Sequence, residues 1–191
     1  QGVGEGGLAH IGPAHNGDDA GFGLWFDGNF DYWVRELHGF QNNLMFAGDY
    51  KIILNKGNYI PQDTIDFRIN KGKNYKVFEV LPYIRIVNPD IRYKGNKVVA
   101  KFSLQQYTVD PVKTIALFAH TESHVSSNIQ TAKVSSEINT AVSPLTEYEL
   151  SMDLSQTTGI QREHSYFFRI GALSSTSEAK YNYSPAVEID L

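Results

Sequence analysis

Hydrophobic and polar residues alternate in short runs along most of the chain from Phe22 onward, and turn residues separate the runs. A period of two is typical of half-buried strands, and no stretch has a helical period long enough to predict a helix. Gly, Asn and Pro lie between most runs, as in Lys94-Gly95-Asn96. The pattern predicts an all-β protein built from β-sandwiches. The expected strands cover residues 50–54, 64–69, 75–81, 83–87, 98–104, 115–120, 147–152, 166–173 and 186–191.

Proline and glycine positions indicate how this chain is divided. Pro82 falls between two apolar runs, so we expect two domains in tandem, residues 1–81 and 82–191, with no flexible linker between them. Glycine and small polar residues dominate residues 1–19, and such a segment buries too little surface to offset its ordering entropy. We therefore interpret residues 1–19 as a loop or tail.

Composition narrows the classes of function. The 191 residues carry a formal net charge of -4, which gives no basic surface for binding nucleic acid. The chain has no cysteine, which excludes disulfides, thiolate zinc sites and cysteine nucleophiles. No apolar run approaches the roughly 20 residues of a membrane helix. The sequence begins at Gln1, and we expect an export signal or lipid-attachment cysteine to have preceded it.

The stretch Asp27-Gly28-Asn29-Phe30-Asp31-Tyr32-Trp33 has oxygen donors at the spacing that begins an EF-hand loop. The loop also needs Gly at its sixth position and Glu at its twelfth, which are Tyr32 and His38 here. A looser metal site in this region stays open, but we predict no metal. A hairpin with its turn at Asp27-Gly28-Asn29 fits better. Its register places four side chains on one face, namely Trp25, Asp31, Trp33 and Arg35.

Two indoles beside an acid and a guanidinium resemble a sugar-binding platform. Trp25 and Trp33 would stack on a sugar ring while Asp31 and Arg35 bond its hydroxyls. The alternative is that the protein's own chain covers both indoles. Tyr181 and Tyr183 are second-rank binding candidates, because loops at sandwich ends often collect binding residues. Tyrosines there can also simply brace a hairpin.

Catalytic patterns are missing from the sequence. His120-Thr-Glu-Ser-His124 lacks the glutamate position and the helix of a zinc protease motif. The sequence contains no Gly-x-Ser-x-Gly elbow and no phosphate-binding loop. We interpret Glu122, Asp153 and Glu163 as surface charges. We therefore expect a protein that is not an enzyme and uses no cofactor.

Three segments resemble known families. Residues 38–52, which include Leu44-Met45-Phe46-Ala47-Gly48-Asp49-Tyr50, are similar to a segment of transthyretin-like or carboxypeptidase-regulatory-like sandwiches. Residues 63–83, ending in Val80-Leu81-Pro82-Tyr83, resemble the closing strands of that domain. Tyr166-Phe-Phe-Arg-Ile-Gly-Ala and Tyr181-Asn-Tyr-Ser-Pro resemble a fibronectin type III or immunoglobulin-like sandwich.

In this order the segments resemble a family of two-domain Bacteroidetes surface lipoproteins of unknown function. The resemblance implies export, a lipid anchor at the outer membrane, and association with starch-utilisation-type glycan uptake systems. From it we expect an accessory protein that helps present an oligo- or polysaccharide to an outer-membrane transporter complex. The alternative is a structural or assembly module that mediates protein contacts at the cell surface.

Overall fold

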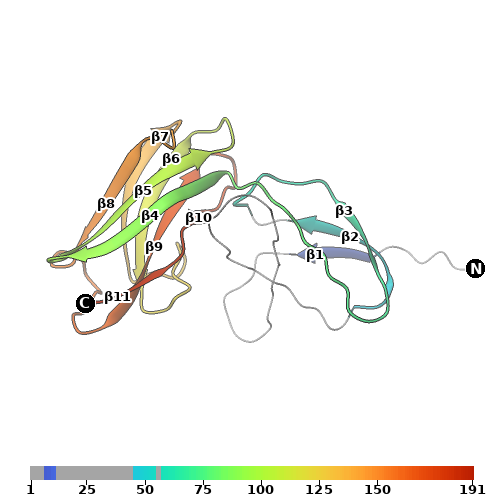
Figure 1. The fold of residues 1–191 in the computed structure, drawn as a ribbon, viewed down its shortest axis with the longest axis horizontal. Helices are drawn as coiled ribbons and strands as arrows, with labels where there is room; N and C mark the ends of the chain where they lie inside the picture. The colour runs from blue at the N-terminus through green and yellow to red at the C-terminus, as the bar shows by residue number, and fades with distance from the viewer. Residues whose placement is uncertain (1–6, 12–44, 55–56) are drawn as a thin grey trace, which may run out of the picture. The chain divides into compact units, whose positions relative to one another are not determined.

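Every regular element that the structure describes is a β-strand. The computed structural model describes residues 7–11, 45–54 and 57–191, and it divides the chain into two compact units, Gln1–Leu81 and Pro82–Leu191 (Figure 1). Within these described ranges, no helix is long and apolar enough to cross a membrane. The prediction of an all-β protein is confirmed.

The first unit contains a three-stranded sheet in the order β1-β2-β3. β2 (Gly48–Leu54) pairs with β3 (Ile65–Ile69) in antiparallel orientation, and β1 (Gly7–Ile11) pairs with β2 in parallel. The interpretation of residues 1–19 as only a loop or tail is therefore corrected. Pairing in a sheet uses backbone N–H and C=O groups, which a glycine-rich sequence retains in full.

A small apolar core lies on one face of this sheet. Ile52 and Leu54 of β2 are buried together with Phe78, and Ile65 and Phe67 of β3 pack against them. The expected strand over residues 75–81 is absent, because the structure shows no regular element there. Phe78 reaches the core and Val80 packs against it, whereas Tyr75, Val77 and Leu81 remain exposed.

The second unit is a sandwich of two antiparallel sheets. The first sheet has the order β4-β5-β8, with β4 at Ile84–Lys94, β5 at Lys97–Gln106 and β8 at Glu147–Asp153. β5 alternates regularly, and its inward side chains Val98, Ala100, Phe102 and Leu104 are at most 2% exposed. The central strand of this sheet therefore contributes one continuous row to the core.

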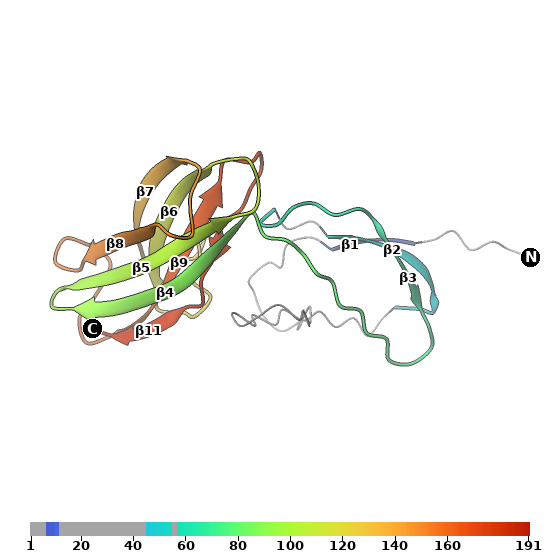
Figure 2. The same cartoon turned by 45° about the horizontal axis from the view of Figure 1, so that its top comes forward.

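The second sheet has the order β10-β9-β6-β7, and β11 also pairs with β9. The strands β6, β7, β9 and β11 of this sheet are labelled in Figure 2. Its strands are β6 (Val112–His120), β7 (Ala132–Thr140), β9 (Ser165–Ser174), β10 (Asn182–Tyr183) and β11 (Val187–Asp190).

β6 is buried on both faces. Ile115, Leu117 and Ala119 pair with Ala172, Ile170 and Phe168 of β9, and these residues form the inner layer of the core. Ala116 and Phe118 point to the other face and are also fully buried. The outer face of this sheet therefore needs a cover of its own, which the tyrosines described below provide.

The sequence pattern did not predict β7. Only Ala132 is buried in this strand, and polar residues occupy most of its length. β7 is an edge strand, so it does not need the apolar face that reveals a central strand. It contacts β8, the edge strand of the other sheet, and this contact forms one side of the pocket described next.

Candidate functional site

A shallow pocket of about 520 Å³, open to solvent, lies in the second unit at the place where β7 and β8 meet. The residues that line it come from the start of β7, the end of β8 and the loop after β8. Most of their side chains carry hydroxyl, amide or charged groups. The lining consists of Thr131, Ala132, Lys133, Val134, Ser151, Asp153, Gln156, Thr157 and Thr158.

The β4–β5 hairpin supplies the polar neighbours of the pocket. Its two-residue turn is Gly95-Asn96, and Gly95 has the positive φ of 64° that a glycine allows at the first position of such a turn. The sequence predicted this turn, and the structure confirms it. The turn brings Asn96 and Lys97 next to Asp153, the last residue of β8 and the cross-strand partner of Lys97.

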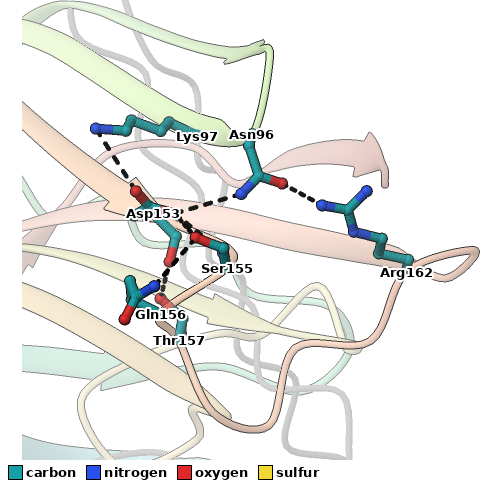
Figure 3. Close-up of polar contacts among 7 residues, drawn as sticks. All are labelled: Asn96, Lys97, Asp153, Ser155, Gln156, Thr157 and Arg162. Atoms are coloured by element: carbon teal, nitrogen blue, oxygen red, sulfur yellow. Dashed lines mark hydrogen bonds and ion pairs between the residues drawn. The ribbon is translucent and has the colours of Figure 1, made fainter.

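Asp153 is the centre of a network of polar contacts (Figure 3). Its Oδ1 accepts hydrogen bonds from the Ser155 backbone N–H at 3.0 Å, the Ser155 hydroxyl at 2.6 Å and the Asn96 amide at 3.4 Å. The Lys97 ammonium lies 3.6 Å from Oδ2. Arg162 extends the network, because its guanidinium donates to the side-chain oxygen of Asn96.

These contacts stabilise the charged form of Asp153. The hydrogen bonds from the Ser155 hydroxyl and backbone N–H lower the pKa of the Asp153 carboxyl, and Lys97 adds to the effect. The carboxylate therefore stays ionised at neutral pH. Because Ser155 and Lys97 hold both of its oxygens, Asp153 is fixed in position at the pocket.

The loop after β8 folds back on its own strand. The Gln156 N–H and the Thr157 hydroxyl both donate to the Asp153 carbonyl, at 3.1 Å and 2.7 Å. Gly159 has a φ of 89°, and a Cβ at this position would lie 3.0 Å from Cγ2 of Thr131. A glycine is thus required where the loop passes closest to the start of β7.

The tryptophan platform predicted from the sequence lies outside the described residues. Trp25, Asp31, Trp33 and Arg35 all belong to the range 12–44, so their grouping stays a prediction.

Tyr181 and Tyr183 lie together on the outer face of the second sheet, with ring centroids 5.8 Å apart. Both rings pack edge-on against Phe118, at centroid distances of 5.3 Å and 5.9 Å. The Tyr183 hydroxyl accepts a hydrogen bond from the Ser127 N–H, and the Arg169 guanidinium carbon lies 4.8 Å from the centre of its ring. Other residues of the protein therefore already contact the ring and the hydroxyl of Tyr183.

Tyr181 is also partly buried. Burial raises the pKa of its phenol, and the adjacent Tyr183 adds to the shift, so the hydroxyl is neutral at physiological pH. Both side chains are only partly exposed. The arrangement matches the bracing alternative better than an open stacking surface, and the pocket is the stronger candidate site.

His120 is the last residue of β6, and His124 lies in the turn that follows this strand. The Nδ1 atom of His120 accepts a hydrogen bond from the Glu122 N–H at 3.0 Å, as in a local turn. No group of three or more His, Asp or Glu side chains suited to a metal occurs in the described part of the chain.

From the sequence, Asp153 is an ordinary surface charge, and no pattern distinguishes the other residues of the pocket. One local signal was present, because Asp153-Leu154-Ser155 has the spacing at which an aspartate side chain bonds the backbone N–H two residues later. That signal predicts a turn. It does not predict that β7, more than ten residues earlier, completes the pocket.

The fold defines a class, an all-β protein of two tandem units, and the second unit carries a pocket lined mostly by polar residues. Residues 20–81 match the N-terminal domain of a protein of unknown function, DUF3823, and residues 84–188 match the domain of unknown function DUF3823_C. The chain belongs to the DUF3823 family.

The solved structures that resemble the chain include three from bacteria of the genera Bacteroides and Parabacteroides. The first, from Bacteroides uniformis, is described as a candidate carbohydrate binding protein; it is 33% identical, has a TM-score of 0.73, and the match covers 81% of this chain and 80% of that one. A DUF3823 protein from Bacteroides ovatus is 22% identical, with a TM-score of 0.64 and coverage of 77% and 76%. One from Parabacteroides merdae is 20% identical, with a TM-score of 0.69 and coverage of 97% and 96%. The comparison with curated proteins gave no match.

Proposed function

We propose that this protein is a non-enzymatic accessory protein that binds glycan at the cell surface. The observation that carries the proposal is the pocket between β7 and β8, whose lining offers hydroxyl, amide, ammonium and carboxylate groups. These groups donate and accept the hydrogen bonds that sugar hydroxyls form. The Bacteroides uniformis relative, described as a candidate carbohydrate binding protein, supports the same class of ligand.

The fixed carboxylate suits this role. A saccharide loses little affinity to side-chain ordering if the acceptor is already held in place, and Ser155 and Lys97 hold Asp153 before any ligand arrives. Hydrogen bonds to a sugar largely replace those to water, so each adds little. We expect dissociation constants between about 1 μM and 1 mM.

The wider role in the proposal rests on the family resemblance. It comprises export, a lipid anchor at the outer membrane, and presentation of glycan to a transporter of the starch-utilisation type. Trp25 and Trp33 belong to the proposal as a second place for sugar stacking, on the sequence argument alone.

The test is isothermal titration of the protein with a panel of plant, host and microbial oligosaccharides. Thr158 is exposed and lines the pocket, so Thr158→Phe should fill it and abolish binding. Thr140→Phe is the matched control, since Thr140 is exposed at the far end of β7 and should leave binding intact. Loss of binding in Trp33→Ala, with an unchanged melting temperature, would move the site to the tryptophans. Absence of binding to every saccharide would reject the proposal in favour of an assembly module.

A further inference from the structure

The charges around the pocket are unequal, and this imbalance bears on which glycans it accepts. The only acid in the described lining is Asp153, and Lys97 of β5 lies 3.6 Å from it. The same lining contains Lys133 of β7. Within the described part of the chain, Lys133 forms no ion pair.

A second cation is attached to the same network. The guanidinium of Arg162 donates to Asn96, whose amide in turn donates to Asp153 (Figure 3). Arg162 forms no ion pair within the ranges that the structure describes. Glu163 follows it in the chain, but its backbone N–H donates to the Leu191 carbonyl and its side chain does not pair with Arg162.

The other acids of β8 are already engaged. Glu147 and Glu149 lie 3.3 Å and 3.2 Å from the ammonium of Lys101 on β5, and neither lines the pocket. Counting the lining and the attached network gives three cations, Lys97, Lys133 and Arg162, against the single carboxylate of Asp153. An uncompensated cation at a pocket wall favours a ligand that brings its own negative charge.

We propose that the pocket selects acidic saccharides, with Lys133 as the residue that pairs with their carboxylate or sulfate group. Asp153 then accepts hydrogen bonds from neighbouring sugar hydroxyls. This inference rests on the proposed glycan-binding function and names the class of glycan. Carboxylate and sulfate share the required charge, and the experiment separates them.

The probes are trigalacturonic acid, its fully methyl-esterified form, and a sulfated disaccharide with its desulfated counterpart. Each pair differs in charge and keeps the same sugar backbone. Titration calorimetry should show that the acidic member binds about two- to fivefold more tightly, the range expected for one partly exposed ion pair. Raising the ionic strength should weaken the acidic member selectively. For each pair, the ratio of the affinities of the charged and the neutral member is compared. The pair with the larger ratio shows whether carboxylate or sulfate is the preferred anion.

Lys133→Met should bring the acid and its ester to equal affinity while leaving the ester unchanged. Lys113→Met is the matched control: Lys113 is an exposed lysine on β6, about 16 Å along the strand from Phe118, the residue opposite Lys133. Lys113→Met should keep the preference for the acid over its ester. Circular dichroism melting shows whether each variant folds.

The outcomes distinguish this inference from the function on which it rests. Equal binding of acid and ester by the unaltered protein, abolished by Thr158→Phe, would overturn acidic selectivity and keep glycan binding. A preference for the acid that survives Lys133→Met would also overturn the assignment. Failure of every saccharide to bind would overturn both proposals together.

Discussion

Gly171 of β9 lies beneath the ring of Phe118 of β6 with no space for a side chain between them. A Cβ at Gly171 would be 2.8 Å from Cε2 of Phe118, and also 3.0 Å from Tyr181 and 3.2 Å from Tyr183. Gly171 is paired with Ala116, which lies two residues before Phe118 on the same face of β6. The missing side chain therefore lets three aromatic rings close over the outer face of the sheet.

The first prediction is that Gly171→Ala destabilises the second unit. A methyl group would force the rings of Phe118, Tyr181 and Tyr183 outward, and overpacking of this kind costs about 1–3 kcal/mol. The free energy of unfolding should be measured by urea denaturation. Gly48→Ala is the control, since its Cβ would meet only Tyr50 at an ordinary 3.7 Å. Equal stability of Gly171→Ala and the unaltered protein would show that the rings can move at no cost.

The second prediction concerns Ser184, which is 2% exposed. Its hydroxyl accepts a hydrogen bond from the Ile170 N–H at 3.1 Å and donates to the Pro185 carbonyl at 2.9 Å. Ser184→Ala leaves a buried N–H without this acceptor, and we expect a loss of about 1–3 kcal/mol in unfolding free energy. Ser136→Ala removes an exposed hydroxyl on β7 and should change stability by less than about 0.5 kcal/mol. Similar losses in the two variants would contradict the role of the Ser184 hydroxyl.

The third prediction uses the lowered pKa of Asp153. In the unfolded chain this carboxyl titrates near 3.8, and in the folded protein Ser155 and Lys97 hold its pKa below that value. Its stabilising contribution is therefore complete above the unfolded pKa and is lost as pH falls through the folded pKa. Urea denaturation from about pH 6 to about pH 2.5 should show a steeper loss of stability in the unaltered protein than in Asp153→Asn.

The control for this pH series is Glu122→Gln, which removes an exposed carboxylate from a different loop. Its stability should follow the unaltered protein across the whole range. If Asp153→Asn also follows the unaltered protein, the contacts of Asp153 do not stabilise the fold, and its fixed position would need another cause.

The central strands could be predicted from sequence because each buries a regular row of side chains. In β5 the residues Val98 to Leu104 alternate between core and surface, which is the signal that periodicity detects. β7 could not be found this way, since an edge strand needs only one partner and carries mostly polar residues. The sequence pattern also did not predict β1, because the pairing of β1 with β2 uses backbone groups, which leave no hydrophobic pattern in the sequence.

The pocket was harder to predict than the fold. Its residues come from β7, β8 and the loop after β8, and only the packing of two sheet edges brings Lys133 and Asp153 to the same cavity. Their aromatic side chains made Tyr181 and Tyr183 candidates for ligand binding, but in the structure both pack against the cluster that contains Phe118. Aromatic content alone does not separate a stacking surface from a local core.

The last prediction concerns Gly159, which follows the residues of the loop after β8 that line the pocket. In Gly159→Ala the new Cβ lies 3.0 Å from Cγ2 of Thr131. The alanine must also adopt the φ of 89° found at this position, which residues with a side chain disfavour. The left-handed backbone costs about 1–2 kcal/mol in unfolding free energy, and the steric contact adds to it. Thr131→Ser in the Gly159→Ala background removes Cγ2 and should restore only the steric part. Recovery of full stability in the double variant would mean that the backbone conformation costs nothing. No loss in Gly159→Ala itself would mean that the loop does not need glycine, and that the wall of the pocket is free to shift.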